Sequence, residues 1–343
     1  MLALGAAALF GASAPAAKLL LMKMPAPLIL SGLLYLGAGL FAALVMALRS
    51  VVEISPPEAP LNLRDLPNLG AIVVLGGVVG PVLMLLGLER LSGIAGALLL
   101  NLEMPLTMVL AAAIFGEHLG RRVMLAGLSV FAGACLLALS GAPWHATAAG
   151  TAALTAACLA WALDNNLSQR LSTRDPFAVV RLKGLCAGTC TLAIGLAWHG
   201  TIPSWAYSGE ALVVGSLSYG LSLVLVMLAL REIGAARQAT YFAAAPFIGA
   251  AISAPLLAER FTSREVLAAG LMALGVALLL REHHRHEHTH EELEHEHLHI
   301  HDEHHRHEHP GRAAEPHSHL HRHPRLTHDH QHLPDAHHRH EHN

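Results

Sequence analysis

Two long stretches of this chain align with each other: GLERLSGIAGALLLNLEMPLTMVLAAAIFGEHLGRRVMLAGLSVFAGACLLAL (residues 87–139) and ALREIGAARQATYFAAAPFIGAAISAPLLAERFTSREVLAAGLMALGVALLL (residues 229–280). At a constant offset of 142 residues, Glu117 aligns with Glu259 and Gly133 aligns with Gly275. A chain that repeats itself in this way is built from two copies of one structural unit.

Outside these stretches the first 281 residues are also dominated by Leu, Ala, Gly and Val, and 53% of the whole chain of 343 residues is hydrophobic. A helix needs about 20 mostly apolar residues to cross a membrane. The abundant small residues suit helices that pack on helices within lipid. We expect ten spans, near residues 2–22, 28–48, 70–88, 93–115, 122–140, 149–168, 178–198, 210–230, 239–258 and 264–281.

Ten spans in two repeats give five spans per repeat, which is an odd number. The two repeats must therefore enter the membrane in opposite senses, as in secondary transporters whose site lies at mid-membrane between the halves. The sequence predicts an all-α polytopic membrane protein with ten transmembrane helices in two inverted five-helix repeats. We assign residues 1–142 to the first repeat, 147–281 to the second, and 282–343 to a separate tail.

Lys and Arg are enriched in the cytoplasmic loops of membrane proteins. With the N-terminus inside, the inner loops would carry eight basic residues and the outer loops four. The distribution predicts a protein of the inner (plasma) membrane with both termini in the cytoplasm. The inner set is Arg49, Arg64, Arg121, Arg122, Arg170, Arg174, Arg231 and Arg237, and the outer set is Lys23, Arg90, Arg260 and Arg264.

Three segments carry a resemblance to a known family: LLLNLEMPLTMVLAAAIFGEHL (98–119), CLAWALDNNLSQRLS (158–172) and LREIGAARQATYFAAAPFIGAAISAPLLAERFT (230–262). The body of the chain resembles the EamA-type members of the drug/metabolite transporter superfamily. The resemblance implies ten helices and the transport of small organic solutes. The sequence departs from the usual Glu-Pro of the fourth helix, which is here Glu103-Met104-Pro105, and the counterpart of Glu103 in the second half is Ala245.

Ionisable and amide side chains at membrane depth are costly and usually face protein or a wet cavity. They gather in the first and fourth helices of each repeat, where a central site would require them. Structural roles stay open as alternatives to a role in transport. Lys18 could anchor the outer end of its helix, Asp164 to Asn166 could stabilise an inner helix end, and Arg237 could extend to the cytoplasmic face. The predicted substrate pathway comprises Lys18, Asn101, Glu103, Asp164, Asn165, Asn166, Arg237, Gln238 and Tyr241.

Glu103 lies near the middle of its predicted span and is the strongest candidate for transport. Burial favours the neutral form of a carboxylic acid, so this side chain could exchange protons with a substrate. Pro105 and Pro246 leave backbone carbonyls unpaired, and such carbonyls can line a cavity. Glu117 and Glu259 lie at helix ends beside arginines, so we expect interfacial salt bridges there instead.

The tail has a different composition from the body. Of the 27 histidines only His118, His145 and His199 precede residue 281, which leaves 24 in the tail. Because the tail has little apolar surface to bury, we expect it to be disordered without metal. Its alternating HEHLHIH segment favours binding of Zn, Ni, Co or Cu ions. The predicted ligands are His286, His288, His290, His295, His297, His299, His301, His304 and His305.

Three functions remain open. The leading prediction is an exporter of small organic metabolites or drugs, with proton coupling left open and the tail as an accessory. The second is a divalent-metal transporter whose tail buffers its cargo, and the third is a membrane metal store or sensor. The sequence indicates no enzyme, no required cofactor, no nucleotide-binding loop and no nucleic-acid partner. The expected partners are a small organic solute, membrane lipid and divalent metal ions at the tail, and a homodimer stays open.

Overall fold

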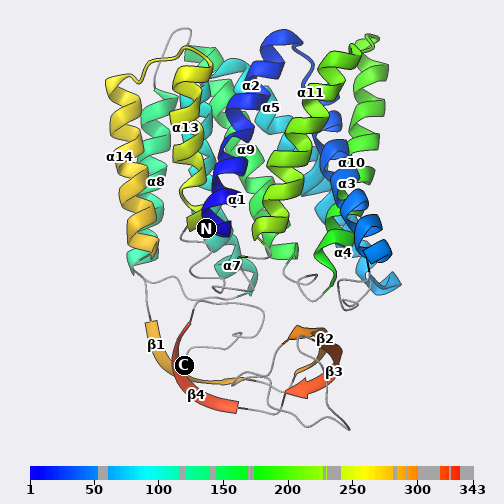
Figure 1. Ribbon diagram of the computed structural model, residues 1–343. Coiled ribbons are helices and arrows are strands. Elements are labelled where there is room, and N and C mark those ends of the chain that lie inside the picture. The colour runs from blue at the N-terminus through cyan, green and yellow to red at the C-terminus, as the bar shows by residue number, and fades with distance from the viewer. Residues whose placement is uncertain are drawn as a thin grey trace.

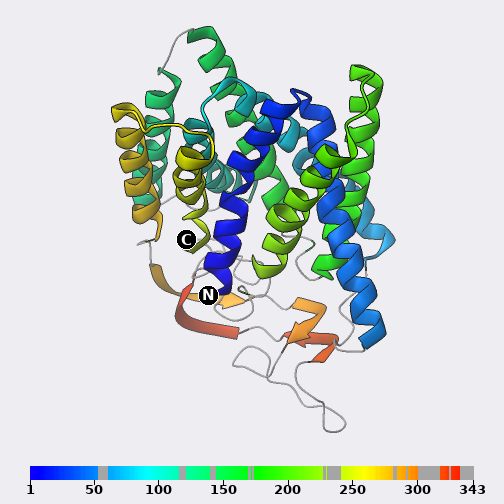
Figure 2. The same cartoon turned by 45° about the horizontal axis from the view of Figure 1, so that its top comes forward.

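The computed structural model describes residues 1–52, 61–115, 121–139, 144–168, 171, 174–226, 229, 241–280, 284–290, 293–299, 317–323 and 326–332. Its body is a bundle of upright helices, with the N-terminus and the end of the last helix at the same end of the bundle (Figure 1). Seen from the tilted view, the first helices, in blue, stand between the yellow and green helices of the second half (Figure 2).

Each half of the body contributes an ordered series of helical elements. The first half contains α1 (Leu2–Gly11), α2 (Ser13–Lys23), α3 (Pro27–Val52), η1 (Leu63–Asp65), α4 (Leu66–Ile72), η2 (Val73–Val79), α5 (Gly80–Arg90), α6 (Gly93–Leu99), η3 (Leu100–Leu102), α7 (Glu103–Phe115) and α8 (Arg121–Ala138). The second half contains α9 (Trp144–Ser168), α10 (Pro176–His199), α11 (Trp205–Gly215), η5 (Ser216–Leu221), α13 (Ala245–Leu256) and α14 (Ser263–Leu280).

Helix occurs in the described part of every predicted span, but the helices are not equally apolar. Within the described residues, six continuous helices are long and apolar enough to cross a membrane: Leu2–Lys23, Pro27–Val51, Leu63–Arg90, Gly93–Leu110, Pro176–His199 and Trp205–Val226. The prediction of a polytopic helical membrane protein is confirmed at this level. The other helices are shorter or carry more polar residues, as α13 with its 12 residues illustrates.

Local sequence signals explain where several helices begin and end. The Ser92 hydroxyl accepts a hydrogen bond from the Ala95 N–H at the start of α6, and the Asp175 carboxylate accepts one from the Phe177 N–H at the start of α10. Such caps satisfy N–H groups that lack a partner in the first turn. Gly200, with φ of 63°, ends α10 in the left-handed conformation that glycine adopts most easily.

Glycines allow α3 and α10 to pack backbone against backbone. A Cβ atom added to Gly39 would lie 2.6 Å from the Leu185 nitrogen, and one added to Gly184 would lie 2.6 Å from the Gly39 nitrogen. A Cβ atom added to Gly188 would likewise lie 2.5 Å from the Leu36 nitrogen. In lipid, this close approach supplies packing energy that the hydrophobic effect cannot. The small residues of these helices therefore join the two halves.

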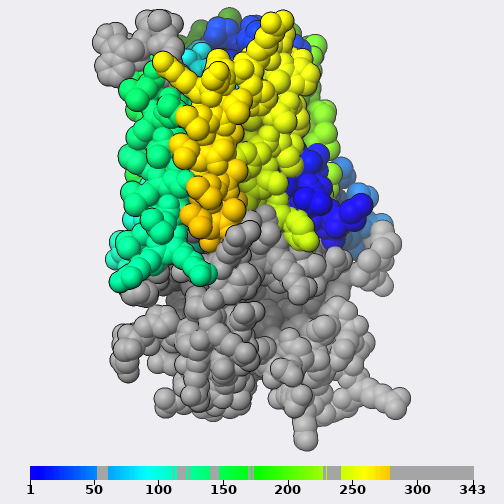
Figure 3. Space-filling view, turned by 90° about the vertical axis from the view of Figure 1, so that its left-hand side faces the viewer, coloured from blue at the N-terminus to red at the C-terminus, as the bar shows by residue number. Residues whose placement is uncertain are grey.

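The last helices of the two halves, α8 and α14, also lie side by side and form one outer face of the bundle (Figure 3). Gly133 on α8 faces the Ala268 carbonyl on α14, while Gly275 on α14 faces the Ala126 carbonyl on α8. The contacts are reciprocal, because each residue of α8 has its counterpart 142 positions later. The outer face itself is apolar and suits lipid, since it exposes Leu125, Leu128, Phe131, Val266, Leu267 and Leu274.

A π-helical turn interrupts the third helix of each half. In η2 the Gly80 N–H donates to the Leu75 carbonyl, and in η5 the Ser222 N–H donates to the Leu217 carbonyl. Both bonds span five residues instead of the four of an α-helix. Donors and acceptors of the two turns are related by the same offset of 142 residues, so the turns occur at equivalent positions.

Four short segments of the tail form paired strands. Strand β1 (His284–His290) pairs antiparallel with β4 (Leu326–His332), and β2 (Leu293–His299) pairs with β3 (His317–His323). The alternation of histidine with other residues has the period of two that suits an extended chain. Paired strands satisfy their backbone groups without a large core. The disorder expected of the metal-free tail stays a prediction, and the helical description applies to the body. The rest of residues 282–343 lies outside the described residues.

Candidate functional site

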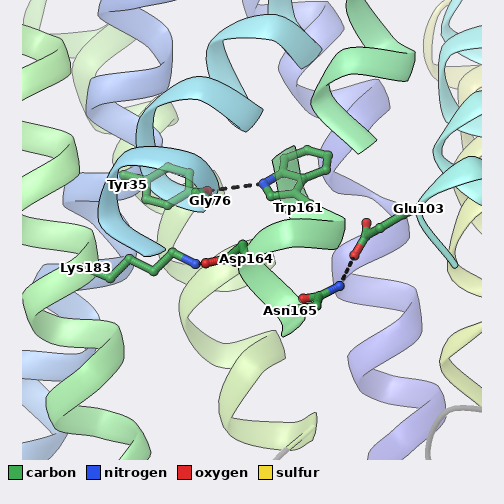
Figure 4. Close-up of polar contacts among 7 residues, drawn as sticks. All are labelled: Tyr35, Gly76, Glu103, Trp161, Asp164, Asn165 and Lys183. Carbon is green, nitrogen blue, oxygen red and sulfur yellow. Dashed lines mark hydrogen bonds and ion pairs between the residues drawn. The ribbon is translucent and has the colours of Figure 1, made fainter. Parts of the chain in front are cut away.

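An ion pair between Asp164 on α9 and Lys183 on α10 lies inside the helix bundle (Figure 4). The Lys183 Nζ atom is 2.6 Å from Asp164 Oδ2, and the two side chains are only 18% and 9% exposed. Each charge offsets the cost of burying the other, since an unpaired charge within the membrane is unfavourable. The other carboxylate oxygen, Oδ1, is buried and has no hydrogen-bond partner within the described part of the chain.

Gly76 makes room for the Asp164 side chain. A Cβ atom at this position would overlap the Asp164 carboxyl group, so only glycine allows η2 to lie this close to α9. The neighbouring Gly77 similarly lies against the Cβ atom of Ala187 on α10. The first π turn is thereby fixed against two helices of the second half.

The Gly76 carbonyl is free of the helix's own hydrogen bonds. In an α-helix it would accept from the Gly80 N–H, but that group donates to the Leu75 carbonyl instead. The next residue, Pro81, has no N–H to offer. Two buried aromatic side chains bind the free carbonyl: the Tyr35 hydroxyl donates at 2.5 Å and the Trp161 Nε1–H donates at 3.2 Å (Figure 4).

Glu103 lies on another side of α9 from the ion pair. The Asn165 Nδ2 group donates to Glu103 Oε1 at 2.8 Å (Figure 4). Adjacent residues of a helix point about 100° apart, so Asp164 and Asn165 contact different helices. Glu103 is half-buried, and within the described residues no cationic side chain lies within ion-pair distance of its carboxyl group.

The backbone around Glu103 is irregular. The 3₁₀ turn η3 directly precedes it, and Pro105 cannot donate to the Asn101 carbonyl. The Thr107 hydroxyl donates to the Glu103 carbonyl at 2.8 Å. Short 3₁₀ segments within a helix often mark functional hinges. Pro246 differs from the prediction, because it occupies the first turn of α13, where a missing N–H leaves no bond broken.

Two of the predicted amides bind backbone groups. Asn101 is buried, and its Nδ2 group donates to the Leu98 carbonyl at 2.9 Å. Asn166 is also buried, and its Nδ2 group donates to the Ala162 carbonyl at 2.8 Å and to the Thr107 carbonyl at 3.2 Å. Asn166 therefore ties α9 to α7, beside the site.

Lys18 and Glu259 both act on helix ends. The Lys18 Nζ atom donates to the Leu88 carbonyl at 2.5 Å and to the Leu91 carbonyl at 2.8 Å, at the end of α5. The Glu259 carboxylate accepts from the Gly93 and Ile94 N–H groups, at 2.7 and 2.9 Å, where α6 begins. Each charge complements the partial charge of the helix terminus that it binds. Capping thus replaces the interfacial salt bridge predicted for Glu259.

The remaining predictions fall at the margin of the structure or outside it. Tyr241 is 45% exposed, just before α13. Arg237, Gln238 and Glu117 lie outside the described residues. The same holds for His301, His304 and His305, while strands β1 and β2 contain the other predicted ligands, His286, His288, His290, His295, His297 and His299.

The sequence prediction missed Lys183, Tyr35, Trp161 and Gly76. Lys183 could have been found, because it is a lysine inside a predicted span, which is the signal that singled out Lys18. Buried aromatic residues carry no such signal, since most of them only fill space. The role of Gly76 depends on a π turn, which no sequence pattern indicates.

Comparisons with known proteins agree with this architecture. The chain is 28% identical over 286 residues to an uncharacterized transporter of Methanothermobacter thermautotrophicus, covering 79% of this chain and 82% of the relative. It is 31% identical over 192 residues to an uncharacterized protein of Pseudomonas aeruginosa, covering 56% of this chain and 66% of that protein. A solved structure titled only as the crystal structure of a protein has a TM-score of 0.57 at 17% identity, over 82% of this chain and 97% of its own, and therefore shares the fold.

Two segments of the chain, residues 1–139 and 148–281, match the EamA-like transporter family. Together they cover the whole helical body. The match and the apolar helices indicate a multi-pass membrane protein, and a transporter in place of an enzyme. The chain therefore belongs to the EamA-like transporter family.

Proposed function

We propose that the protein is a secondary transporter that exports small organic metabolites or drugs across the inner membrane in exchange for protons. The observation that carries the proposal is the Glu103 carboxyl group, which lies within an apolar helix beside Asn165 and has no cationic partner among the residues that the structure describes. The neighbouring acid, Asp164, is already neutralised by Lys183. Glu103 is therefore the acid whose charge would be balanced by a proton or a solute that binds and leaves during transport.

A proton and a solute could balance that charge in turn. An unpaired carboxylate in the membrane is costly, so the group is stable either protonated or bound to a hydrogen-bond donor or cation. Asn165 supplies one donor at 2.8 Å. An amine or hydroxyl group of the solute would supply the second. Loss of the proton on one side of the membrane would thus favour solute binding, and return of the proton would favour release.

Alternating access requires two halves that can move against each other, and we propose that the halves are inverted repeats of five spans. The reciprocal glycine contacts of α8 and α14 support this arrangement. The Ser129 hydroxyl also donates at 2.7 Å to the Leu271 carbonyl, which belongs to the residue 142 positions later. The distribution of Lys and Arg further supports ten spans with both termini in the cytoplasm.

We propose that the tail is a metal-binding accessory to this transporter. Histidines alternate along its strands, and neutral imidazoles bind Zn, Ni, Co and Cu ions. No specific observation favours metal as the transported cargo. In the described part of the helical body, no group of three or more His, Cys, Asp or Glu side chains is placed to hold an ion.

The test is transport by Glu103→Gln in inside-out vesicles. A panel of amino acids, drugs and nucleotide metabolites is screened with wild-type protein, with and without a proton gradient. The amide keeps the shape of the side chain but cannot exchange a proton, so we expect folded protein in the membrane and loss of gradient-driven transport.

Glu89→Gln is the matched control, because Glu89 forms its ion pair with its neighbour Arg90 at the partly exposed end of α5. It should transport like the wild type. Gradient-driven transport that persists unchanged in Glu103→Gln would refute proton exchange at this residue.

A further inference from the structure

An ion pair joins the two halves at the end of the bundle opposite the N-terminus. Lys23 is the last residue of α2, and its Nζ atom is 2.5 Å from Glu210 Oε2 on α11. Both side chains are about half exposed, at 48% and 47%. A pocket of about 520 Å³ lies beside the pair, and its lining includes Lys23, His199, Tyr207 and Glu210.

The end near the N-terminus carries a corresponding bond. The Asn68 Nδ2 group on α4 donates to the Leu167 carbonyl in the last turn of α9 at 2.9 Å. Asn68 and Glu210 are 142 residues apart, so they occupy the same position in the third helix of each half. Their partners, Leu167 and Lys23, lie in the last turn of the first helix of the opposite half.

Each of these third helices has its π turn shortly after the bonded residue. The turn η2 begins at Val73, five residues after Asn68, and η5 begins at Ser216, six residues after Glu210. A π turn disrupts the regular hydrogen-bond ladder and is a recognised site of kinking. The segment between each π turn and its bonded residue can therefore tilt without unfolding the helix.

The two bonds differ in their surroundings. Near Asn68, the Arg174 Nε atom is also 2.9 Å from Asp65 Oδ2, and these side chains are largely buried. At the opposite end the Lys23–Glu210 pair is exposed beside the open pocket, while Glu259 and the Ser92–Glu265 hydrogen bond also join the halves nearby. Exposed ion pairs contribute little to stability, which suits a bond that must break in every cycle.

We propose that Lys23–Glu210 and Asn68–Leu167 are the two gates of the transporter, and that the π turns η2 and η5 are their hinges. The gates open alternately, each exposing the site from one end of the bundle. Lys23, Asn68 and Glu210 are positioning residues that need not touch the solute. This inference rests on the proposed transport function, but its test requires neither solute nor proton gradient.

The test measures thiol labelling at two equivalent buried positions. The four native cysteines are first replaced, and one reporter is then introduced by Ala211→Cys, beside Glu210, or by Leu69→Cys, beside Asn68. The native side chains are 0% and 7% exposed, so labelling should be slow until the adjacent gate opens. Membrane-impermeant thiol reagents are applied separately from each side of the membrane.

Breaking one gate should open that end and close the other. We expect Glu210→Gln to raise labelling at position 211 by up to about fivefold and to lower it at position 69, because an exposed ion pair shifts an equilibrium by about that much. Lys23→Gln should have the same effect, and the double variant should add little, since both changes break one bond. Asn68→Ala should act in the opposite sense.

Glu89→Gln serves again as the control, because its ion pair lies at the same end of the bundle but does not join the halves. It should leave labelling at both positions unchanged. Equal labelling in all variants would overturn the proposal. So would a rise at both positions together, because that result means that the bonds hold the fold instead of alternating. A failure of Glu103→Gln to affect transport would leave these outcomes unaltered.

Discussion

Two acidic side chains of the helix bundle are treated in opposite ways. Asp164 is bound by Lys183 at 2.6 Å and is enclosed by Gly76 of the first π turn. Glu103 has only the Asn165 amide at 2.8 Å and no cation among the residues that the structure describes. Asp164 is thus paired with a cation and fixed between helices, and Glu103 has no cationic partner among these residues. The proposed transport cycle uses both, since a fixed framework lets one group change its protonation state repeatedly.

The largest effect on stability should come from breaking the framework pair. Lys183→Met leaves the Asp164 carboxylate buried without its partner, which typically costs about 3–5 kcal/mol. Adding Asp164→Asn to Lys183→Met should recover most of this loss, because no charge then remains unpaired. Denaturant unfolding in mixed micelles measures both changes.

Glu103→Gln is the comparison variant in the same assay. The amide can still hydrogen-bond to Asn165, so we expect a change within about 1 kcal/mol. A loss as large as that of Lys183→Met would contradict the distinction between the two acids.

A smaller loss should follow from Gly76→Ala. The new methyl group would overlap the Asp164 carboxyl group and push η2 away from α9. Overpacking of this kind costs about 1–3 kcal/mol. Gly70→Ala is the matched control, since nothing lies within 4 Å of a Cβ atom at that position. If both variants unfold at the same denaturant concentration as the wild type, the close contact at Gly76 does not constrain the helix.

Tyr35→Phe should cost less again. It removes one of two donors from the Gly76 carbonyl, and Trp161 Nε1 remains as the other. The expected loss is about 0.5–1.5 kcal/mol, as for a typical hydrogen bond. Combining Tyr35→Phe with Trp161→Phe should cost more than the sum of the single changes, because the buried carbonyl then loses its last partner. Simple additivity would show that the two aromatic residues do not share this carbonyl.

Removal of the tail should affect the helical body least. We expect truncation after Arg281 to leave organic-solute transport largely intact, because the body packs its two halves without the tail. The same truncation should remove most binding of Zn²⁺ or Ni²⁺, since 24 of 27 histidines are lost. Calorimetry of both proteins at two pH values measures this difference.

The metal affinity of the full-length protein should also fall below about pH 6. Only the neutral imidazole binds metal, and histidine takes up a proton as the pH falls through about 6.5. Tight metal binding by the truncated body, or metal efflux that depends on the tail, would favour metal as the cargo.

Much of the site could be predicted from residue type and position. Glu103, Asp164 and Asn165 were predicted because acids and amides are rare within apolar helices. Lys18 gave the same signal, yet it binds carbonyls at the end of α5. A rare polar residue thus predicts a specific partner, but the sequence cannot say whether that partner is a solute or a backbone group.

The sequence by itself determined the membrane helices, the internal repeat and the acid at mid-span, because each depends on composition and spacing along the chain. Only the tertiary structure decided which charge is paired. Asp164 and Lys183 meet because glycines bring η2, α9 and α10 close together, and Gly76 binds Tyr35 and Trp161 because a π turn frees its carbonyl. These contacts depend on how closely helices that are remote in sequence approach each other. The sequence shows that Asp164 is charged, but only the fold brings Lys183 close enough to offset the cost of burying that charge.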